Sequence, residues 1–146
     1  MTFRDVFEET EVAGCIRQGI QALGHNSHLI VNNHNTRFEG SVDIDTCLVN
    51  QRLYTQENRW DYAFGLRNRI VYVEVHTASD SQVSVVIAKY QWLKDWQNRQ
   101  PNSQNLKNNS SYHWIASGSV SITKNSRFSR SLTASGLGFP KRMLEV

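Results

Sequence analysis

The chain has 146 residues, of which 39% are hydrophobic and 20% are charged. This balance is typical of one globular domain and argues against a disordered chain. No apolar run reaches the roughly 18 residues that span a bilayer, and the acidic, amphipathic N-terminus is unlike a signal peptide. Two cysteines, Cys15 and Cys47, are too few for a disulfide framework and are interpreted as small core residues. We therefore expect a single cytoplasmic domain over residues 1–146, with no membrane partner.

The first part of the chain predicts a helix followed by strands. Apolar residues recur with a helical period as far as Leu23, and Thr2 and Gly24 suit the two ends of that helix. Farther along, Val42 and Leu48 lie among polar residues in a pattern that favours a strand. The elements expected up to residue 59 are a helix over 3–23, a short strand over 29–31, a strand over 37–49 and a polar link over 50–59.

The second part predicts strands separated by one long helix. Two apolar runs are joined by a short polar link, and the Ser79–Ser81 cluster then suits the start of a helix. An Asn- and Ser-rich stretch predicts an exposed loop before the next strand. The elements expected here are strands over 61–66 and 70–77, a helix over 82–97, a loop over 101–111, a strand over 112–116 and alternation over 120–123, with 126–140 unassigned.

This order of elements predicts an α/β fold. A helix that crosses between two strands implies layers of helix on sheet and at least one parallel strand pair. We therefore expect a central mixed sheet flanked by helices, in the order α-β-β-β-α-β, with a basic C-terminal extension from about residue 117.

Three polar residues stand out within the two apolar strands. Asp61 begins the first strand, whereas Glu74 and His76 lie near the end of the second. Because side chains alternate along a strand, Glu74 and His76 share one face. Taken singly, Asp61 also fits a strand-start cap or an arginine partner, and His76 fits a core histidine. A buried acid such as Glu74 needs a partner or a metal ion, so the three together favour a divalent-metal hydrolase.

An Asp followed thirteen residues later by Glu-x-His, together with the element order, resembles the restriction-endonuclease-like fold of the PD-(D/E)XK nuclease superfamily. The resemblance covers residues 3 to about 116. It implies that Asp61 and Glu74 correspond to the two acids that hold Mg²⁺ in these nucleases. The wider strings 73–76 and 89–93 also look like an uncharacterised bacterial family within this group.

The chain departs from the superfamily pattern at the lysine that helps to orient or activate water. His76 stands at that position, and histidine can act as a base or as a metal ligand. In some members of the superfamily the lysine comes from the following helix, where this chain has Lys89. The role therefore falls to His76, to Lys89 or to neither.

The proposed site calls for a hard cation with oxygen ligands. Asp61 and Glu74 would supply carboxylates, and the Val75 carbonyl would add a third oxygen. The expected cofactor is Mg²⁺, or Mn²⁺ if His76 is itself a ligand. Four other acids are weaker candidates to join the site: Asp43, Asp45, Glu8 and Glu11.

Charge is unevenly divided along the chain. Residues 97–146 carry seven basic side chains and one acidic side chain, a net charge of +6, so residues 1–96 carry −3 of the total of +3. A basic segment suits a polyanion, although it also fits a merely soluble surface. The candidate backbone-binding residues are Arg127, Arg130, Lys141 and Arg142.

Together these features predict a metal-dependent nuclease that hydrolyses phosphodiester bonds, with DNA favoured over RNA as its substrate. The alternative is a catalytically inactive nuclease-fold module that binds nucleic acid or a partner protein. A homodimer would suit cleavage of both strands of a duplex.

Overall fold

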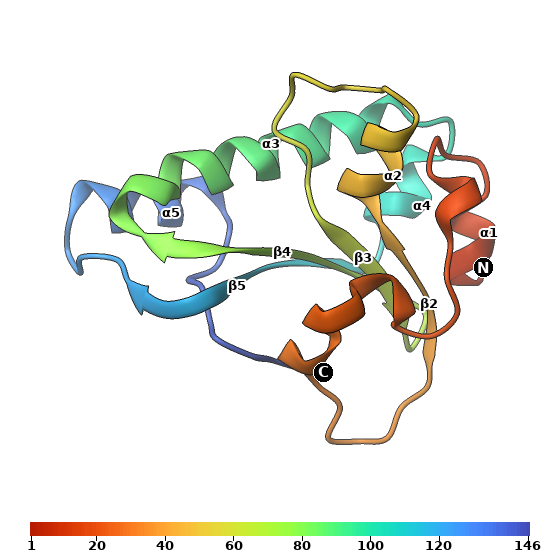
Figure 1. Cartoon of the computed structure of the whole chain (residues 1–146), viewed down its shortest axis with the longest axis horizontal. Coiled ribbons are helices and arrows are strands. Elements are labelled where there is room, and N and C mark those ends of the chain that lie inside the picture. The colour runs from red at the N-terminus through yellow and green to blue at the C-terminus, as the bar shows by residue number, and fades with distance from the viewer.

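A computed structural model describes residues 1–146 and contains a four-stranded mixed sheet flanked by helices (Figure 1). The sheet has the order β2-β3-β4-β5. Its first two pairings are antiparallel, whereas β4 and β5 run parallel. The predicted α/β class, mixed sheet and parallel pair are therefore confirmed. The strands are β1 (Ile30–Val31), β2 (Phe38–Asp43), β3 (Tyr62–Leu66), β4 (Arg69–Ser79), β5 (Ser110–Ser121) and β6 (Leu144–Glu145).

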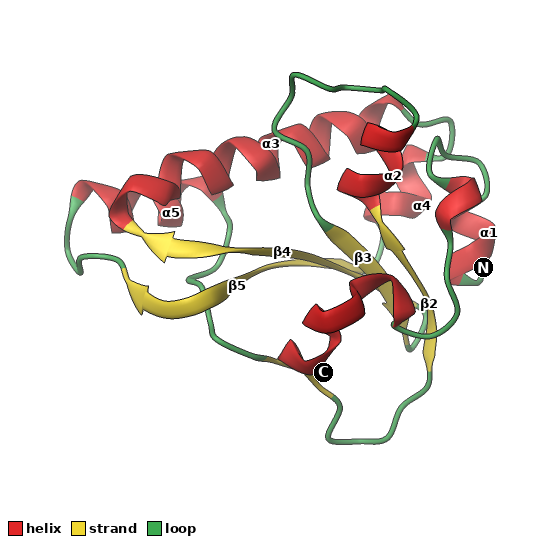
Figure 2. Ribbon diagram, viewed as in Figure 1, coloured by secondary structure: helices red, strands yellow, loops and turns green.

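The longest helix is the crossover between the two parallel strands. It lies along one face of the sheet, above β4 and β5, and a shorter helix packs beside its first turns (Figure 2). The helices are α1 (Phe3–Phe7), α2 (Ile44–Asn50), α3 (Val83–Arg99), α4 (Ser103–Lys107) and α5 (Arg127–Ser135), with 3₁₀ turns η1 (Ala13–Cys15), η2 (Gln21–Leu29) and η3 (Asp80–Gln82). No helix is both long and apolar enough to cross a membrane.

The two faces of the sheet bury separate apolar clusters. The larger cluster lies between the sheet and α3, and Tyr72, Trp96 and Trp114 are among its members. The smaller cluster includes Val71 and Val73, and it lies on the face covered by η2 and the C-terminus. Residues of β4 therefore alternate between the two clusters, as a strand buried on both sides requires.

The predicted helix over 3–23 is wrong beyond Phe7. The Thr10 hydroxyl donates to the Phe7 carbonyl at 2.7 Å and accepts from the Val12 N–H at 3.2 Å. These bonds close the first helix with a turn, because a threonine side chain competes with the helical backbone for the same groups. Gly19 then adopts a positive φ of 53°, which is incompatible with a continuing helix. The helical period in this stretch reflects burial in separate turns.

Other segments also differ from the expected elements, or form an element where none was assigned. The predicted strand over 37–49 ends at Asp43, whose carboxylate accepts the Thr46 N–H at 2.9 Å and starts α2. The loop predicted over 101–111 contains α4, and the unassigned segment after 126 forms α5, which begins with a capping box at Ser126. The alternating segments after residue 111 form one continuous strand, β5.

The two cysteines form a disulfide, contrary to the expectation of unpaired core residues. Cys15 in η1 and Cys47 in α2 are bonded across 32 positions of sequence. The bond ties the N-terminal turns to the short helix α2. These short elements are therefore held together by a covalent link, which restricts the unfolded chain.

Candidate active site

Asp61 and Glu74 lie side by side where β3 begins. Tyr62 pairs with Val73, so one step farther along the same register sets Asp61 opposite Glu74. The Asp61 N–H donates to Glu74 Oε1 at 3.1 Å, and the Val75 N–H donates to Asp61 Oδ2 at 3.0 Å. Hydrogen bonds from backbone N–H groups to the two carboxylates thus replace backbone–backbone hydrogen bonds at the point where the pairing of β3 with β4 ends. This juxtaposition is the one that the strand pattern predicts.

Lys89 enters the same site from α3. The helix turns Val86 and Leu93 toward the sheet, and Lys89 lies between them on that buried stripe. Its Nζ donates to Glu74 Oε2 at 2.6 Å and lies 4.0 Å from Asp61 Oδ1. The helix thus places the Lys89 ammonium beside both carboxylates.

His76 shares the α3-facing side of β4 with Glu74. Its Nδ1 lies 3.5 Å from Glu74 Oε2, and its Nε2 lies 2.7 Å from Gln82 Oε1. The His76 carbonyl also accepts the indole N–H of Trp114 at 3.1 Å. The ring is held from two sides, and about a fifth of its side-chain surface stays exposed (22%).

The electrostatics of the cluster follow from burial. Glu74 is fully buried, whereas 19% of the Asp61 side chain and 18% of the Lys89 side chain are exposed. Burial, followed by the charge of Glu74, raises the pKa of Asp61 to about 7, against the opposing charge of Lys89. Burial alone would lower the pKa of Lys89, but the two carboxylates together raise it. The hydrogen bond to Glu74 raises the pKa of His76, against the effect of burial.

The four other acids considered as site members lie elsewhere or are engaged. Asp43 caps α2, and exposed Glu8 lies 3.9 Å from Arg4. Glu11 accepts hydrogen bonds from three residues, Tyr54, Trp96 and Gln100, at 2.7 to 3.2 Å. Asp45 accepts from Arg59 at 2.8 Å, yet its charge still contributes to the raised pKa values of Asp61 and Lys89. Of these acids, Asp45 is the one with an electrostatic connection to the site.

The donor set fits a hard cation that keeps several of its own waters. No group of three or more His, Cys, Asp and Glu side chains is arranged to hold a metal ion. Two carboxylates are nevertheless adjacent, and each of their oxygens has two lone-pair directions. The N–H of Val75 faces Asp61, and the carbonyl of the same strand residue faces the same edge. A cation there would be held by Asp61, Glu74 and Val75 and would offset the repulsion between the two acids.

The basic residues predicted to bind nucleic acid lie in two places. Arg127 and Arg130 are exposed on α5, which packs beside α3. Lys141 and Arg142 are exposed on the segment that pairs with the outer edge of β5 through Lys141. Arg130, together with Lys124 and Phe139, helps to line a hollow of about 630 Å³. The structure thus separates the predicted binding residues into two exposed groups.

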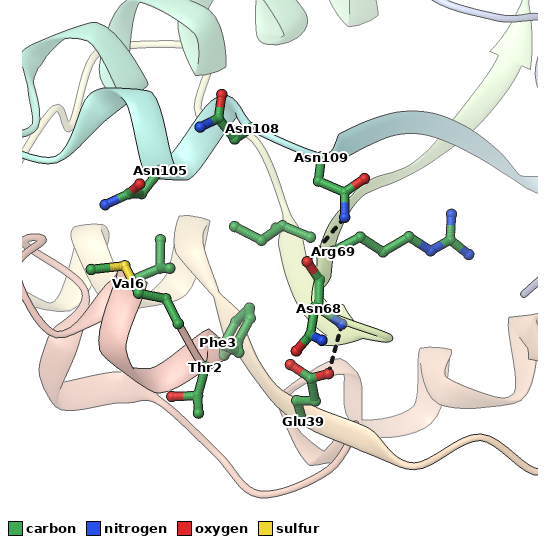
Figure 3. A pocket seen from close by; sticks show the side chains of 11 residues that line it. Thr2, Phe3, Val6, Glu39, Asn68, Arg69, Asn105, Asn108 and Asn109 are labelled. Atoms are coloured by element: carbon green, nitrogen blue, oxygen red, sulfur yellow. Dashed lines mark hydrogen bonds between the residues drawn. The ribbon is translucent and has the colours of Figure 1, made fainter.

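A cavity of about 330 Å³ lies at the start of β4, away from the acid pair (Figure 3). Four asparagines surround it, and Phe3, Val6 and Ile70 add apolar surface. Two hydrogen bonds among its lining residues hold the β3–β4 turn in place. The Asn68 N–H donates to Glu39 at 2.8 Å, and the Asn109 amide donates to the Asn68 carbonyl at 3.1 Å. The cavity lacks the paired acids and the lysine that mark the candidate site.

Sequence reasoning identified Asp61, Glu74, His76 and Lys89 but missed Gln82. Nothing in the spacing links Gln82 to His76, because the five intervening positions cross the turn between a strand and a helix. Comparison of the chain with known protein families, curated proteins and solved structures finds no match. The site is therefore interpreted from its own geometry.

Proposed function

We propose that the protein is a metal-dependent, nuclease-like hydrolase of phosphodiester bonds in nucleic acid. The observation that carries this proposal is the convergence of Asp61, Glu74 and Lys89, with Lys89 Nζ 2.6 Å and 4.0 Å from the two carboxylates. The same three residue types form the site of the PD-(D/E)XK superfamily that the sequence resembles, with the lysine on the following helix as in some of its members. The raised pKa of Asp61 adds support, since perturbed groups gather at functional sites.

Each residue has a chemical task in this proposal. Asp61, Glu74 and the Val75 carbonyl would hold Mg²⁺ or Mn²⁺, which when bound would supply positive charge to the phosphoryl oxygens and make water more acidic. Lys89 orients the attacking water through its ammonium group. His76, beside Glu74, would orient or deprotonate that water.

The basic residues would hold the nucleic acid backbone. Arg127 and Arg130 project from α5, and Lys141 and Arg142 from the strand-like segment beside β5. Contacts of this kind give affinity without sequence preference. DNA is proposed in preference to RNA, and a homodimer would bring two such sites to one duplex.

One observation favours the alternative, a non-catalytic module that binds nucleic acid or a partner protein. Both oxygens of Glu74 already accept hydrogen bonds, one from the Asp61 N–H and one from Lys89. A carboxylate satisfied in this way can serve as a structural anchor between β4 and α3 without any cation.

Metal titration and cleavage assays separate the two functions. Mn²⁺ should bind the wild type in calorimetry, and the loaded protein should cleave plasmid or single-stranded DNA. Glu74→Gln should abolish metal binding and reduce cleavage by about 10²-fold or more. Glu145→Gln makes the same chemical change at an exposed position and should leave both unchanged. No heat at millimolar Mn²⁺ and no cleavage by the wild type would exclude the enzyme and favour the binding module.

A further inference from the structure

The hollow of about 630 Å³ beside α5 combines basic side chains with an exposed aromatic ring. Lys124 lies before the helix, Arg130 lies on it, and Phe139 lies in the segment that follows it. Phe139 is 46% exposed, more than any other Phe, Tyr or Trp residue of the chain. The volume is within the range of ligand sites in proteins. The hollow therefore has room for a ligand that contacts both the ring and the cations.

The exposed ring of Phe139 is carried by a backbone that is fixed on both sides. Leu137 and Pro140 flank it and are buried. Lys141 then pairs with β5 through two backbone hydrogen bonds of 2.8 and 3.2 Å. Because the ring projects from this supported segment, a ligand that contacts it has little chain to order.

The cations of the hollow are free to meet an anion. No acid is among the residues that line it, and Glu145 is the one acidic residue after Asp95. Arg130 donates one N–H to the Asn125 carbonyl at 3.2 Å, so its other donors remain. Neither Arg130 nor Lys124 takes part in an ion pair. Arginine and lysine with free donors are the side chains that bind phosphate best.

Single-stranded nucleic acid supplies both halves of the ligand that this surface suits. Its phosphates match the two cations, and its bases are free to stack on a side chain, whereas bases inside a duplex are covered by their neighbours. Proteins that bind single strands typically combine a positively charged groove with aromatic side chains on which bases stack.

We propose that the hollow beside α5 binds single-stranded nucleic acid, with one base stacked on Phe139 and the adjoining phosphate held by Lys124 and Arg130. The choice of nucleic acid as the ligand rests on the proposed function, whereas the stacking is measured without cleavage. Because α5 packs against α3, a strand bound here lies beside the helix that carries Lys89 (Figure 1).

Fluorescence titration of a short labelled oligothymidylate, without divalent metal, tests the stacking. Phe139→Leu keeps an apolar side chain but removes the ring, and it should weaken binding about 5- to 100-fold. Phe139→Trp should bind at least as tightly as the wild type, and the fluorescence of its added indole should be quenched by the oligonucleotide. Val49→Ala trims an exposed apolar side chain on α2 and should bind as the wild type does.

Three results would overturn the proposal. The first is wild-type affinity in Phe139→Leu, and the second is an equal loss of affinity in that variant for the matching duplex. The third is no binding of oligothymidylate by the wild type, which would leave the exposed ring as a contact for a partner protein.

Salt dependence tests the phosphate contact separately. Lys124→Gln/Arg130→Gln should weaken binding and flatten its dependence on salt, whereas Phe139→Leu should leave that slope unchanged, because the ring carries no charge. Arg37→Gln/Arg52→Gln removes the same charge at exposed positions elsewhere and should retain the wild-type slope. Equal slopes for the two double variants would overturn the role of Lys124 and Arg130.

The same measurements keep this site and the proposed hydrolase function apart. Ring-dependent binding of oligothymidylate by a protein that cleaves nothing with Mn²⁺ would reject the hydrolase and support the single-strand site. Cleavage by a protein whose single-strand affinity is indifferent to Phe139→Leu would support the hydrolase and reject the site.

Discussion

Glu74 is the residue on which the site depends. A fully buried carboxylate in an apolar strand is costly unless donors replace the lost water. Here the Asp61 N–H and the Lys89 ammonium supply that replacement at 3.1 Å and 2.6 Å. The same donors join three elements, β3, β4 and α3, at one point. Stability and proposed chemistry therefore share the same atoms.

Asp61 should make the stability of the metal-free protein dependent on pH. Its pKa rises from 3.8 to about 7 on folding, so the folded state binds more protons than the unfolded state between these values. Stability should therefore fall as pH rises from about 4 to about 7. Asp61→Asn should remove a fall on the order of 2–4 kcal/mol, measured by urea unfolding at several pH values.

The exposed Asp95 provides the control for this experiment. Asp95→Asn makes the same change on the outer side of α3 and should follow the wild-type pH profile. An Asp61→Asn profile parallel to that of the wild type would show that Asp61 titrates alike in the folded and unfolded chains.

At the scale of elements, the disulfide holds the part of the fold that lacks long helices. Cys15 and Cys47 close a loop of 32 positions between η1 and α2. By loop-closure entropy such a bond stabilises by about 3–4 kcal/mol. The Cys15→Ser/Cys47→Ser double variant should therefore melt roughly 10 °C lower than the oxidised protein. Reductant should lower the melting temperature of the wild type and leave that of the double variant unchanged; an unchanged wild type would contradict the prediction.

The docking of α1 depends on a glycine in β3. A Cβ built on Gly65 would lie 2.7 Å from Phe3 Cβ and 3.0 Å from Phe3 Cδ2, so α1 approaches the sheet too closely for any side chain there. Gly65→Ala should destabilise the protein by about 1–3 kcal/mol through this overlap, as measured by urea unfolding. Gly118→Ala places a methyl group in β5 with no neighbour within 4 Å and serves as the control. Equal effects of the two substitutions would show that α1 shifts away from the added methyl group at little cost in stability.

At the scale of the whole molecule, the acids of the candidate site and the excess of basic side chains lie on different segments of the chain. The acids of the candidate site are Asp61, immediately before β3, and Glu74 in β4, whereas the excess of positive charge lies after residue 97. The crossover helix and the bonds between Asp80 and Thr123 bring the basic α5 segment beside the start of α3. A polyanion bound along α5 would thus lie on the same side of the sheet as Lys89.

Salt dependence tests this arrangement. If Arg127 and Arg130 each contact one phosphate, the Arg127→Ala/Arg130→Ala variant should reduce the slope of log affinity against log salt by about 2. Fluorescence titration of duplex DNA at several salt concentrations measures that slope. The exposed pair Arg37 and Arg52 gives a control with the same loss of charge. Equal slopes for the two double variants would assign binding to overall charge rather than to α5.

The alternation of polar and apolar residues was sufficient to predict β3, β4 and α3, and with them the meeting of Asp61 and Glu74. Strand periodicity records which face is buried, and the short link between β3 and β4 leaves only one simple pairing. These features are local, so they can be recognised without knowing the rest of the fold.

Tertiary structure alone decided the remaining features. The Cys15–Cys47 bond depends on segments brought together from different parts of the chain, and the contact of Gln82 with His76 depends on the path of the turn between β4 and α3. The approach of Lys89 to Glu74 likewise depends on how α3 is rotated against the sheet. A sequence pattern specifies that a side chain is buried, but the residue that meets it is set by the packing of the whole domain.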